Sequence, residues 1–181
     1  SVFFAAPDGG VSATTESMVR AIDWLARENV SVINLSLAGP PNEILKGAVA
    51  RAQARGVAVV AAVGNGGPLA RPLFPAAYEG VIGVTAVTAN KHVYRLANRG
   101  DQVDFAAPGV DVLHADGNGG YAAASGTSIA APFVATVVAA ALRDGRLDPG
   151  ALKKLEANAE DLGDRGRDPV YGYGLIRAPG R

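Results

Sequence analysis

The apolar residues of this chain fall into short blocks that predict buried strands. Residues 57–63 are continuously apolar and rich in valine, which is typical of a central strand in a parallel sheet. Residues 81–87 form a second such block, and residues 30–37 a third. The shorter run over residues 2–6 predicts another buried strand near the start of the chain.

Between these blocks, apolar residues recur every three or four positions, as they do on one face of a helix. Met18, Ile22 and Leu25 indicate a first helix, with Thr14 or Thr15 as its N-cap. Further helices are predicted over residues 44–52, 129–142 and 150–159. Strands that alternate with helices predict an α/β fold with a mostly parallel sheet.

Composition narrows the function classes. The 181 residues suit one domain, and equal numbers of basic and acidic residues (17 each) give no electrostatic reason to bind nucleic acid or an anionic membrane. No apolar run reaches the roughly 18 residues of a membrane span. The chain has no cysteine, which excludes disulfides, cysteine-ligated zinc and a cysteine nucleophile. Glycine runs at 64–67 and 117–120 lack the spacing of a dinucleotide-binding loop.

The most informative motif is the run Ser-Gly-Thr-Ser-Ile-Ala-Ala-Pro-Phe-Val-Ala over residues 125–135. It places Ser128 at the start of a helix, where free backbone N–H groups favour negative charge. A nucleophilic serine with an oxyanion beside it suits that position. Ser128 could equally be an ordinary N-cap residue, and this run alone leaves both interpretations open.

This run resembles the nucleophile motif of the subtilisin-like serine proteases, the subtilase family. Five further segments resemble other parts of that family, in its order and spacing: residues 32–40, 59–65, 97–100, 103–109 and 171–176. The resemblance extends along the whole chain. It implies the three-layer fold of that family, with a mostly parallel central sheet and helices on both faces, lacking its N-terminal strands.

The resemblance also assigns roles to residues. Ser128 would be the nucleophile, and its own N–H with the side-chain amide of Asn65 would hold the oxyanion. The family's substrate-pairing strand corresponds to Ser36, Leu37, Ala38 and Gly39. The opposite wall of the pocket corresponds to Ala62, Val63 and Gly64. Without the resemblance, Asn65 would pass as a turn residue and both strands as buried structure.

Several positions depart from the family pattern. Ala38 replaces a glycine in the substrate strand, and its methyl group could narrow the pocket. Ile129, Phe133 and Thr136 replace the usual Met, His and Gly, which we interpret as packing changes.

The family's catalytic Asp and His precede its serine, and this sequence starts after the part that carries them. We therefore interpret residues 1–181 as a partial peptidase domain that begins inside the domain. His92 and His114 fit solvated turns, and Asp101 and Asp104 fit a turn and a strand end, so none of the four is assigned to a triad.

Two functions follow from these observations. The first is a serine endopeptidase, inactive as this fragment alone. The alternative is a non-catalytic relative that binds extended peptides. The expected partner is a polypeptide in extended conformation. We expect no nucleic-acid partner and no membrane span, and we expect the protein to be a monomer. No cofactor or metal is identified, since no acidic cluster matches an EF-hand, although the parent protein could hold a structural calcium ion. The resemblance implies a secreted, periplasmic or cell-surface location. With the Asp-bearing strand missing from its sheet, the isolated chain should fold poorly.

Overall fold

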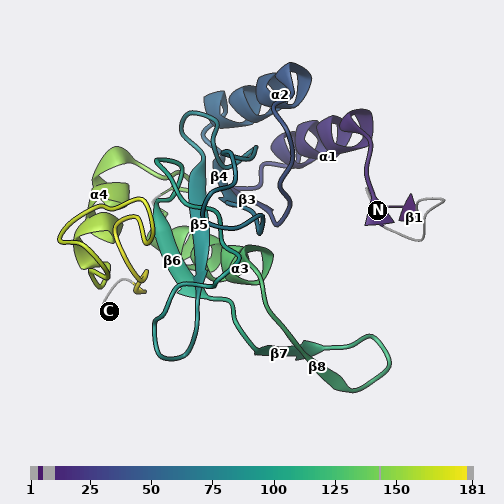
Figure 1. Cartoon of the computed structure of the whole chain (residues 1–181). Coiled ribbons are helices and arrows are strands. Elements are labelled where there is room, and N and C mark those ends of the chain that lie inside the picture. The colour runs from purple at the N-terminus through teal and green to yellow at the C-terminus, as the bar shows by residue number, and fades with distance from the viewer. Residues whose placement is uncertain (1–3, 6–10, 143, 179–181) are drawn as a thin grey trace.

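A four-stranded parallel sheet forms the centre of the structure, a computed structural model that describes residues 4–5, 11–142 and 144–178. The strands lie side by side in chain order: β3 (Val32–Leu35), β4 (Ala58–Ala62), β5 (Ile82–Val87) and β6 (Phe105–Pro108) (Figure 1). Each neighbouring pair is parallel. The three apolar blocks of the sequence thus became adjacent strands, which confirms the α/β prediction.

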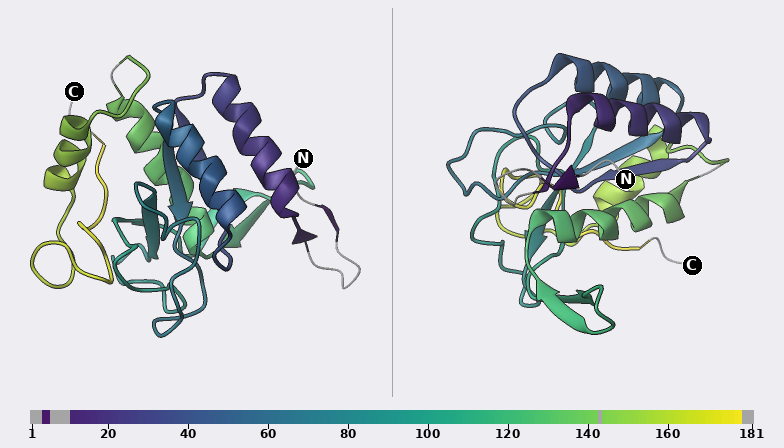
Figure 2. Two further views of the ribbon diagram at one scale, coloured as in Figure 1. Left: turned by 90° about the horizontal axis from the view of Figure 1, so that it is seen from above. Right: turned by 90° about the vertical axis from the view of Figure 1, so that its right-hand side faces the viewer.

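Helices cover both faces of this sheet. Helices α1 (Thr15–Arg27) and α2 (Glu43–Ala54) lie on one face, and α3 (Thr127–Ala141) and α4 (Pro149–Asn158) lie on the other (Figure 2). Alternate residues of β4 point into the two resulting cores, Val59 toward α1 and α2, and Val60 toward α3. Burial on both faces explains why residues 57–63 are continuously apolar.

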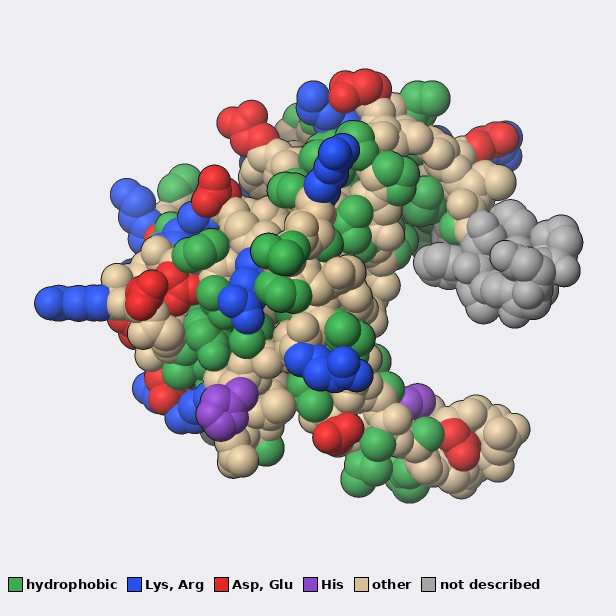
Figure 3. Space-filling view, viewed as in Figure 1, with side chains coloured by type: hydrophobic (Ala, Val, Ile, Leu, Met, Phe, Trp, Pro, Cys, Tyr) green, Lys and Arg blue, Asp and Glu red, His purple; other side chains and the backbone are tan. Residues whose placement is uncertain are grey.

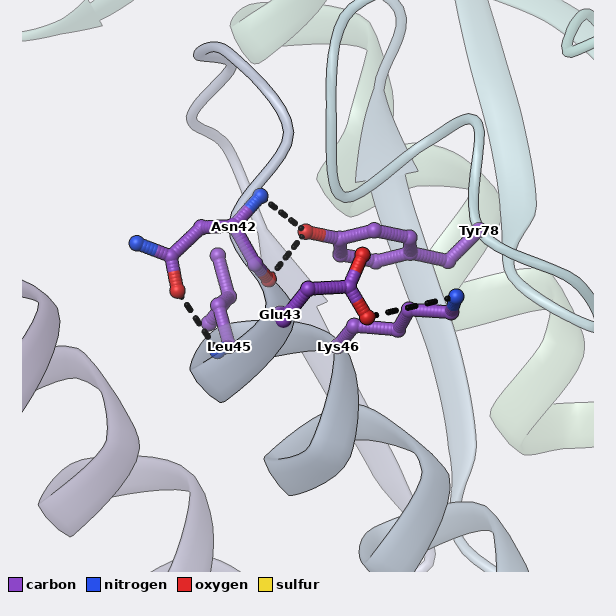
Figure 4. Close-up of polar contacts among 5 residues, drawn as sticks. All are labelled: Asn42, Glu43, Leu45, Lys46 and Tyr78. Atoms are coloured by element: carbon purple, nitrogen blue, oxygen red, sulfur yellow. Dashed lines mark hydrogen bonds and ion pairs between the residues drawn. The ribbon is translucent and has the colours of Figure 1, made fainter.

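Side-chain caps fix where three of the helices begin. The side chain of Asn42 accepts a hydrogen bond from the Leu45 N–H at 2.9 Å and starts α2 (Figure 4). The Tyr78 hydroxyl holds the same residue from the other side, accepting from its N–H at 3.0 Å and donating to its C=O at 2.8 Å. Thr14 caps α1 and Asp148 caps α4 in the same way, so the predicted cap of α1 is confirmed, with Thr14 as the residue used.

The described part of the strand predicted over residues 2–6 is a strand, but it lies outside the main sheet. Residues 2, 3 and 6 lie outside the described residues. The part that is described, β1 (Phe4–Ala5), pairs in antiparallel fashion with β2 (Val11–Ser12) in a separate two-stranded ribbon. The partner of β1 is β2, whereas the hydropathy of residues 2–6 could indicate a strand but not its partner.

Strand β3 consequently stands at the edge of the four-stranded sheet. A cavity of about 270 Å3 opens beside it, lined mainly by apolar residues of α1 and β3, among them Met18, Leu25 and Leu35. Met18 is therefore half-buried against the core rather than enclosed by it.

A hairpin projects from the body of the structure. It consists of β7 (Val112–Ala115) and β8 (Tyr121–Ala124), which pair in antiparallel fashion just before α3 (Figure 1). The space-filling view shows it as an arm that stands clear of the body (Figure 3). Two large apolar side chains on it face solvent, Leu113 at 72% exposure and Tyr121 at 79%.

Candidate active site

Ser128 lies in the first turn of α3, as the sequence predicted. Helix α3 begins at Thr127, and Gly126 is its N-cap residue, with no side chain to occupy the free N–H groups of the first turn. The Ile129 N–H donates to the Gly126 C=O at 3.0 Å, whereas the N–H of Ser128 makes no hydrogen bond within the described residues. The nucleophile candidate therefore has a free backbone donor beside its own hydroxyl.

Asn65 reaches this helix start from the end of β4. Its Oδ1 accepts hydrogen bonds from the Thr127 backbone N–H at 3.0 Å and from the Thr127 Oγ1 at 3.1 Å. Because both partners donate, the oxygen of the amide must face Thr127 and the NH2 group must point away from it. The amide is thus oriented by the helix that carries Ser128.

Gly126 shows where that NH2 group lies. A β-carbon built on Gly126 would stand 3.2 Å from Asn65 Nδ2 and 3.3 Å from Ser128 Oγ. The amide donor and the hydroxyl therefore border one small space, which any side chain at position 126 would fill. The backbone of Gly126, with a φ angle of 156°, also favours glycine. The two groups that the sequence had paired therefore lie on the same side of Gly126.

Thr127 supports this arrangement, although no role was predicted for it. It is fully buried, and its hydroxyl accepts the Gly64 N–H at 3.2 Å while donating to Asn65 Oδ1. One hydroxyl thus joins the end of β4 to the start of α3. In the sequence, only the position of Thr127 between Gly126 and Ser128 could have indicated this role. Its hydrogen-bond partners are more than 60 residues away, and no local pattern reveals them.

Asn98 fixes the loop that carries Asn65, and the sequence analysis did not identify it. Its side chain is fully buried, accepts from the Gly66 N–H at 2.7 Å and donates to the Arg71 C=O at 3.2 Å. Its backbone N–H donates to the Gly64 C=O at 3.0 Å. The loop that presents Asn65 is therefore fixed on both sides. An amide inside a segment shared with the family was the one available hint.

The two predicted substrate segments lie near this site. Ala62, Val63 and Gly64 are buried at and after the end of β4, and Ser36 to Gly39 follow the end of β3. The backbone of Gly39 pairs with that of Phe74 in both directions, at 2.8 and 2.9 Å. Within the described residues, the backbone groups of Ser36, Leu37 and Ala38 make no such pairs. The backbone groups of these three residues are open to pairing with an extended strand, whereas those of Gly39 are already bonded to Phe74.

The histidines and the two aspartates of the sequence analysis lie in other surroundings. His92 and His114 are exposed, and the His114 Nδ1 sits 2.7 Å from the Ala115 carbonyl oxygen on the projecting hairpin. Asp101 is exposed in a turn. Asp104 precedes β6, accepts from the Gly83 N–H at 2.8 Å and pairs with Arg167. Burial raises the pKa of the Asp104 carboxyl, against the opposing influence of these two partners.

Comparison with known proteins identifies the fold. The model of the subtilase family matches residues 1–174. The chain belongs to the subtilase family. It is 37% identical over 171 residues to subtilisin DY of Bacillus licheniformis, and 34% identical over 173 residues to the minor extracellular protease Epr of Bacillus subtilis (strain 168). The structure of the prenylagaramide maturation protease PagA superposes with a TM-score of 0.80 at 26% identity, covering 96% of this chain and 68% of that one.

The subtilase chain described here spans part of its relatives. It matches 61% of subtilisin DY and 27% of the Epr protease, using 91% and 94% of its own length. Within the described ranges, no three acidic or histidine side chains gather as metal ligands would. Nor does any helix in those ranges have both the length and the apolar character needed to cross a bilayer.

Proposed function

We propose that this chain is the C-terminal part of the catalytic domain of a serine endopeptidase, and that Ser128 is its nucleophile. The observation that carries the proposal is the position of Ser128 Oγ and Asn65 Nδ2, which lie on the same side of Gly126. A peptide carbonyl that approaches both groups would have its carbon near the hydroxyl and its oxygen near the amide. We call the longer polypeptide, with its upstream Asp and His, the parent protein.

The reaction follows from these positions. Ser128 Oγ attacks the peptide carbonyl, and its proton passes to the upstream histidine. The Asn65 NH2 and the free Ser128 N–H donate to the oxyanion that forms, at the positive end of α3. The C–N bond then breaks, the amine leaves with the transferred proton, and an acyl group remains on Ser128. Water attacks this ester with the histidine as base, which releases the acid and restores the serine.

The substrate in this proposal is a polypeptide in extended conformation. Its backbone would pair with residues 36–38, whose own backbone groups are unpaired within the described part of the chain. Residues 62–64 would form the opposite wall, and the methyl group of Ala38 would narrow the pocket between them. We further propose that the parent protein is a monomer that acts outside the cytoplasm, as the name of the extracellular protease Epr suggests for that relative.

Covalent labelling tests the nucleophile directly. The parent protein is treated with a fluorophosphonate, digested and analysed by mass spectrometry. We expect the label on Ser128, and we expect Ser128→Ala to abolish both labelling and peptide cleavage. Label on a different residue, or cleavage that survives Ser128→Ala, would refute the assignment.

Kinetics test the oxyanion donor. Asn65→Ala should lower kcat by about 10²–10³ with little change in KM, a range measured for such a donor in subtilisin, itself a member of this family. A change confined to KM would place Asn65 in substrate binding. The same assay on residues 1–181 alone should give no turnover above background. Turnover that His92→Ala or His114→Ala abolishes would instead identify a base within this chain.

The second candidate is a pseudoprotease that binds extended peptides without cleaving them. The free backbone groups of residues 36–38 favour binding, but binding alone gives no use for an oriented Asn65 amide beside Ser128. A parent protein that binds peptides in titration calorimetry, yet neither cleaves them nor reacts with the phosphonate, would support this alternative.

A further inference from the structure

Pro132 leaves a gap in the hydrogen bonding of α3, and the gap falls on Ser128. In an α-helix the C=O of each residue accepts from the N–H four residues later. The residue four positions after Ser128 is Pro132, which lies inside α3 and has no N–H. The carbonyl of the candidate nucleophile therefore lacks its regular helical donor.

The hydroxyl of Ser36 takes the place of that donor. Its Oγ donates to the Ser128 C=O at 2.8 Å, across 92 residues of sequence. The Asn34 Nδ2 donates in turn to Ser36 Oγ at 2.9 Å. Because the amide of Asn34 occupies a lone pair of the hydroxyl, the hydrogen of Ser36 is directed to Ser128. A chain of two hydrogen bonds thus runs from β3 to the first turn of α3.

This contact joins the two halves of the candidate site. Ser36 is the first of the three residues whose backbone is open to a substrate strand, and Ser128 carries the nucleophile. A carbonyl held at 2.8 Å restricts the peptide plane that follows Ser128, and with it the direction of the Ser128 side chain. Both ends of the contact are partly or fully exposed, so its contribution to overall stability should be small.

We propose that the side chain of Ser36 is a positioning residue for Ser128, replacing the helix donor that Pro132 removes. The proposal rests on the proposed function, in which Ser128 attacks the substrate. It assigns to Ser36 a task for its hydroxyl, separate from the pairing of its backbone with substrate. The role is specific: the hydroxyl sets the geometry of the nucleophile relative to the substrate strand.

Substitution of Ser36 in the parent protein provides the first test. Ser36→Ala keeps the backbone and should lower kcat by about 10-fold to 100-fold while KM changes less than about twofold. Ser36→Thr restores a hydroxyl and should recover most of kcat. Ser125→Ala is the matched control, since this nearby hydroxyl binds Asp111 on the hairpin, and it should leave kcat unchanged. An unchanged kcat in Ser36→Ala, or a change confined to KM, would overturn the proposal.

Restoring the helix donor provides a sharper test. Pro132→Ala supplies an N–H four residues after Ser128, so the Ser128 carbonyl no longer depends on Ser36. In the Pro132→Ala background, Ser36→Ala should therefore cost clearly less kcat than it does with Pro132 present. Equal losses in both backgrounds would show that Ser36 acts by another route, and the proposal would fall.

Labelling separates this proposal from the proposed function. Phosphonate on Ser128 of the unsubstituted parent protein shows that the nucleophile is assigned correctly. If that label appears and the Ser36 variants are fully active, only the positioning role fails. If Ser128 is not labelled and no peptide is cleaved, the proposed function fails, and the positioning role fails with it.

Discussion

Replacing Thr127 by valine should destabilise the parent protein, because the substitution removes one hydroxyl with two partners and keeps the shape of the side chain. The Gly64 N–H is buried and would lose the oxygen it donates to at 3.2 Å. The Asn65 Oδ1 would lose one of its two donors. A buried donor left without a partner costs about 1–3 kcal/mol. In a domain of this size, that corresponds to a fall in Tm of about 2–12 °C.

Thr85 offers a matched control of opposite sign. It is fully buried in β5, and its Oγ1 has no hydrogen-bond partner within the described residues. Thr85→Val removes a buried hydroxyl that makes no bond, so it should raise stability by about 1 kcal/mol. The chemical change is the same at both sites, and only the partners differ.

Urea unfolding of both variants and of the unsubstituted parent protein measures the two effects, with kcat as a second readout. Thr127→Val should also lower kcat, since Asn65 is less firmly oriented, whereas Thr85→Val should not. Equal shifts of the unfolding midpoint in the same direction would refute the reasoning, because they would show that the hydrogen bonds of Thr127 do not determine its contribution.

Three further predictions concern charge, oxidation and the isolated chain. Lys91 and Arg177 lower the pKa of Glu160, so its ion pairs stabilise the fold above the ordinary value of 4.5 and lose this effect as the pH falls through the lowered pKa. Glu160→Gln should therefore lower Tm at neutral pH, and this difference should shrink as the pH falls through the lowered pKa; a difference that stays constant down to acid pH would point to packing. The parent protein should resist peroxide, since Ile129 stands beside Ser128 and the half-buried Met18 lies on α1; inactivation that tracks Met18 oxidation would contradict this. Residues 1–181 alone should melt without cooperativity and bind a hydrophobic dye, because β3 is an open edge beside an apolar cavity; a sharp melt with little dye binding would show a self-sufficient domain.

Local patterns in the sequence predicted the elements of the fold well. The apolar block at 57–63 became β4, and the spacing of Ile22 and Leu25 became the buried side of α1. The side chains of Asn42 and Asp148 accept hydrogen bonds from the N–H groups three residues later. Both partners of each bond therefore lie within one short segment of sequence. The strand predicted at the start of the chain is present at Phe4–Ala5, but its partner was not predicted, since hydropathy indicates a strand and not the strand with which it pairs.

The sequence could identify residues of the candidate site, but it could not predict the hydrogen bonds between them. The family resemblance pointed to Ser128 and Asn65, but the hydrogen bond that orients Asn65 comes from Thr127, 62 residues later. The occupation of Gly39 by Phe74 and the capture of the Ser128 carbonyl by Ser36 are equally distant in sequence. Such contacts depend on how the sheet brings loops together, which neither periodicity nor a motif expresses.

The long separations within this site have a consequence for how the chain folds. Ser36 meets Ser128 across 92 residues, and Gly64 meets Thr127 across 63. Closing loops of that length costs chain entropy before any of these contacts forms, and proteins rich in distant contacts fold slowly. Neighbouring strands of the parallel sheet can associate earlier, since each lies closer in sequence to the next. The start of α3 should therefore dock late, and the geometry around Ser128 should be among the last features to form and the first to be lost when the protein begins to unfold.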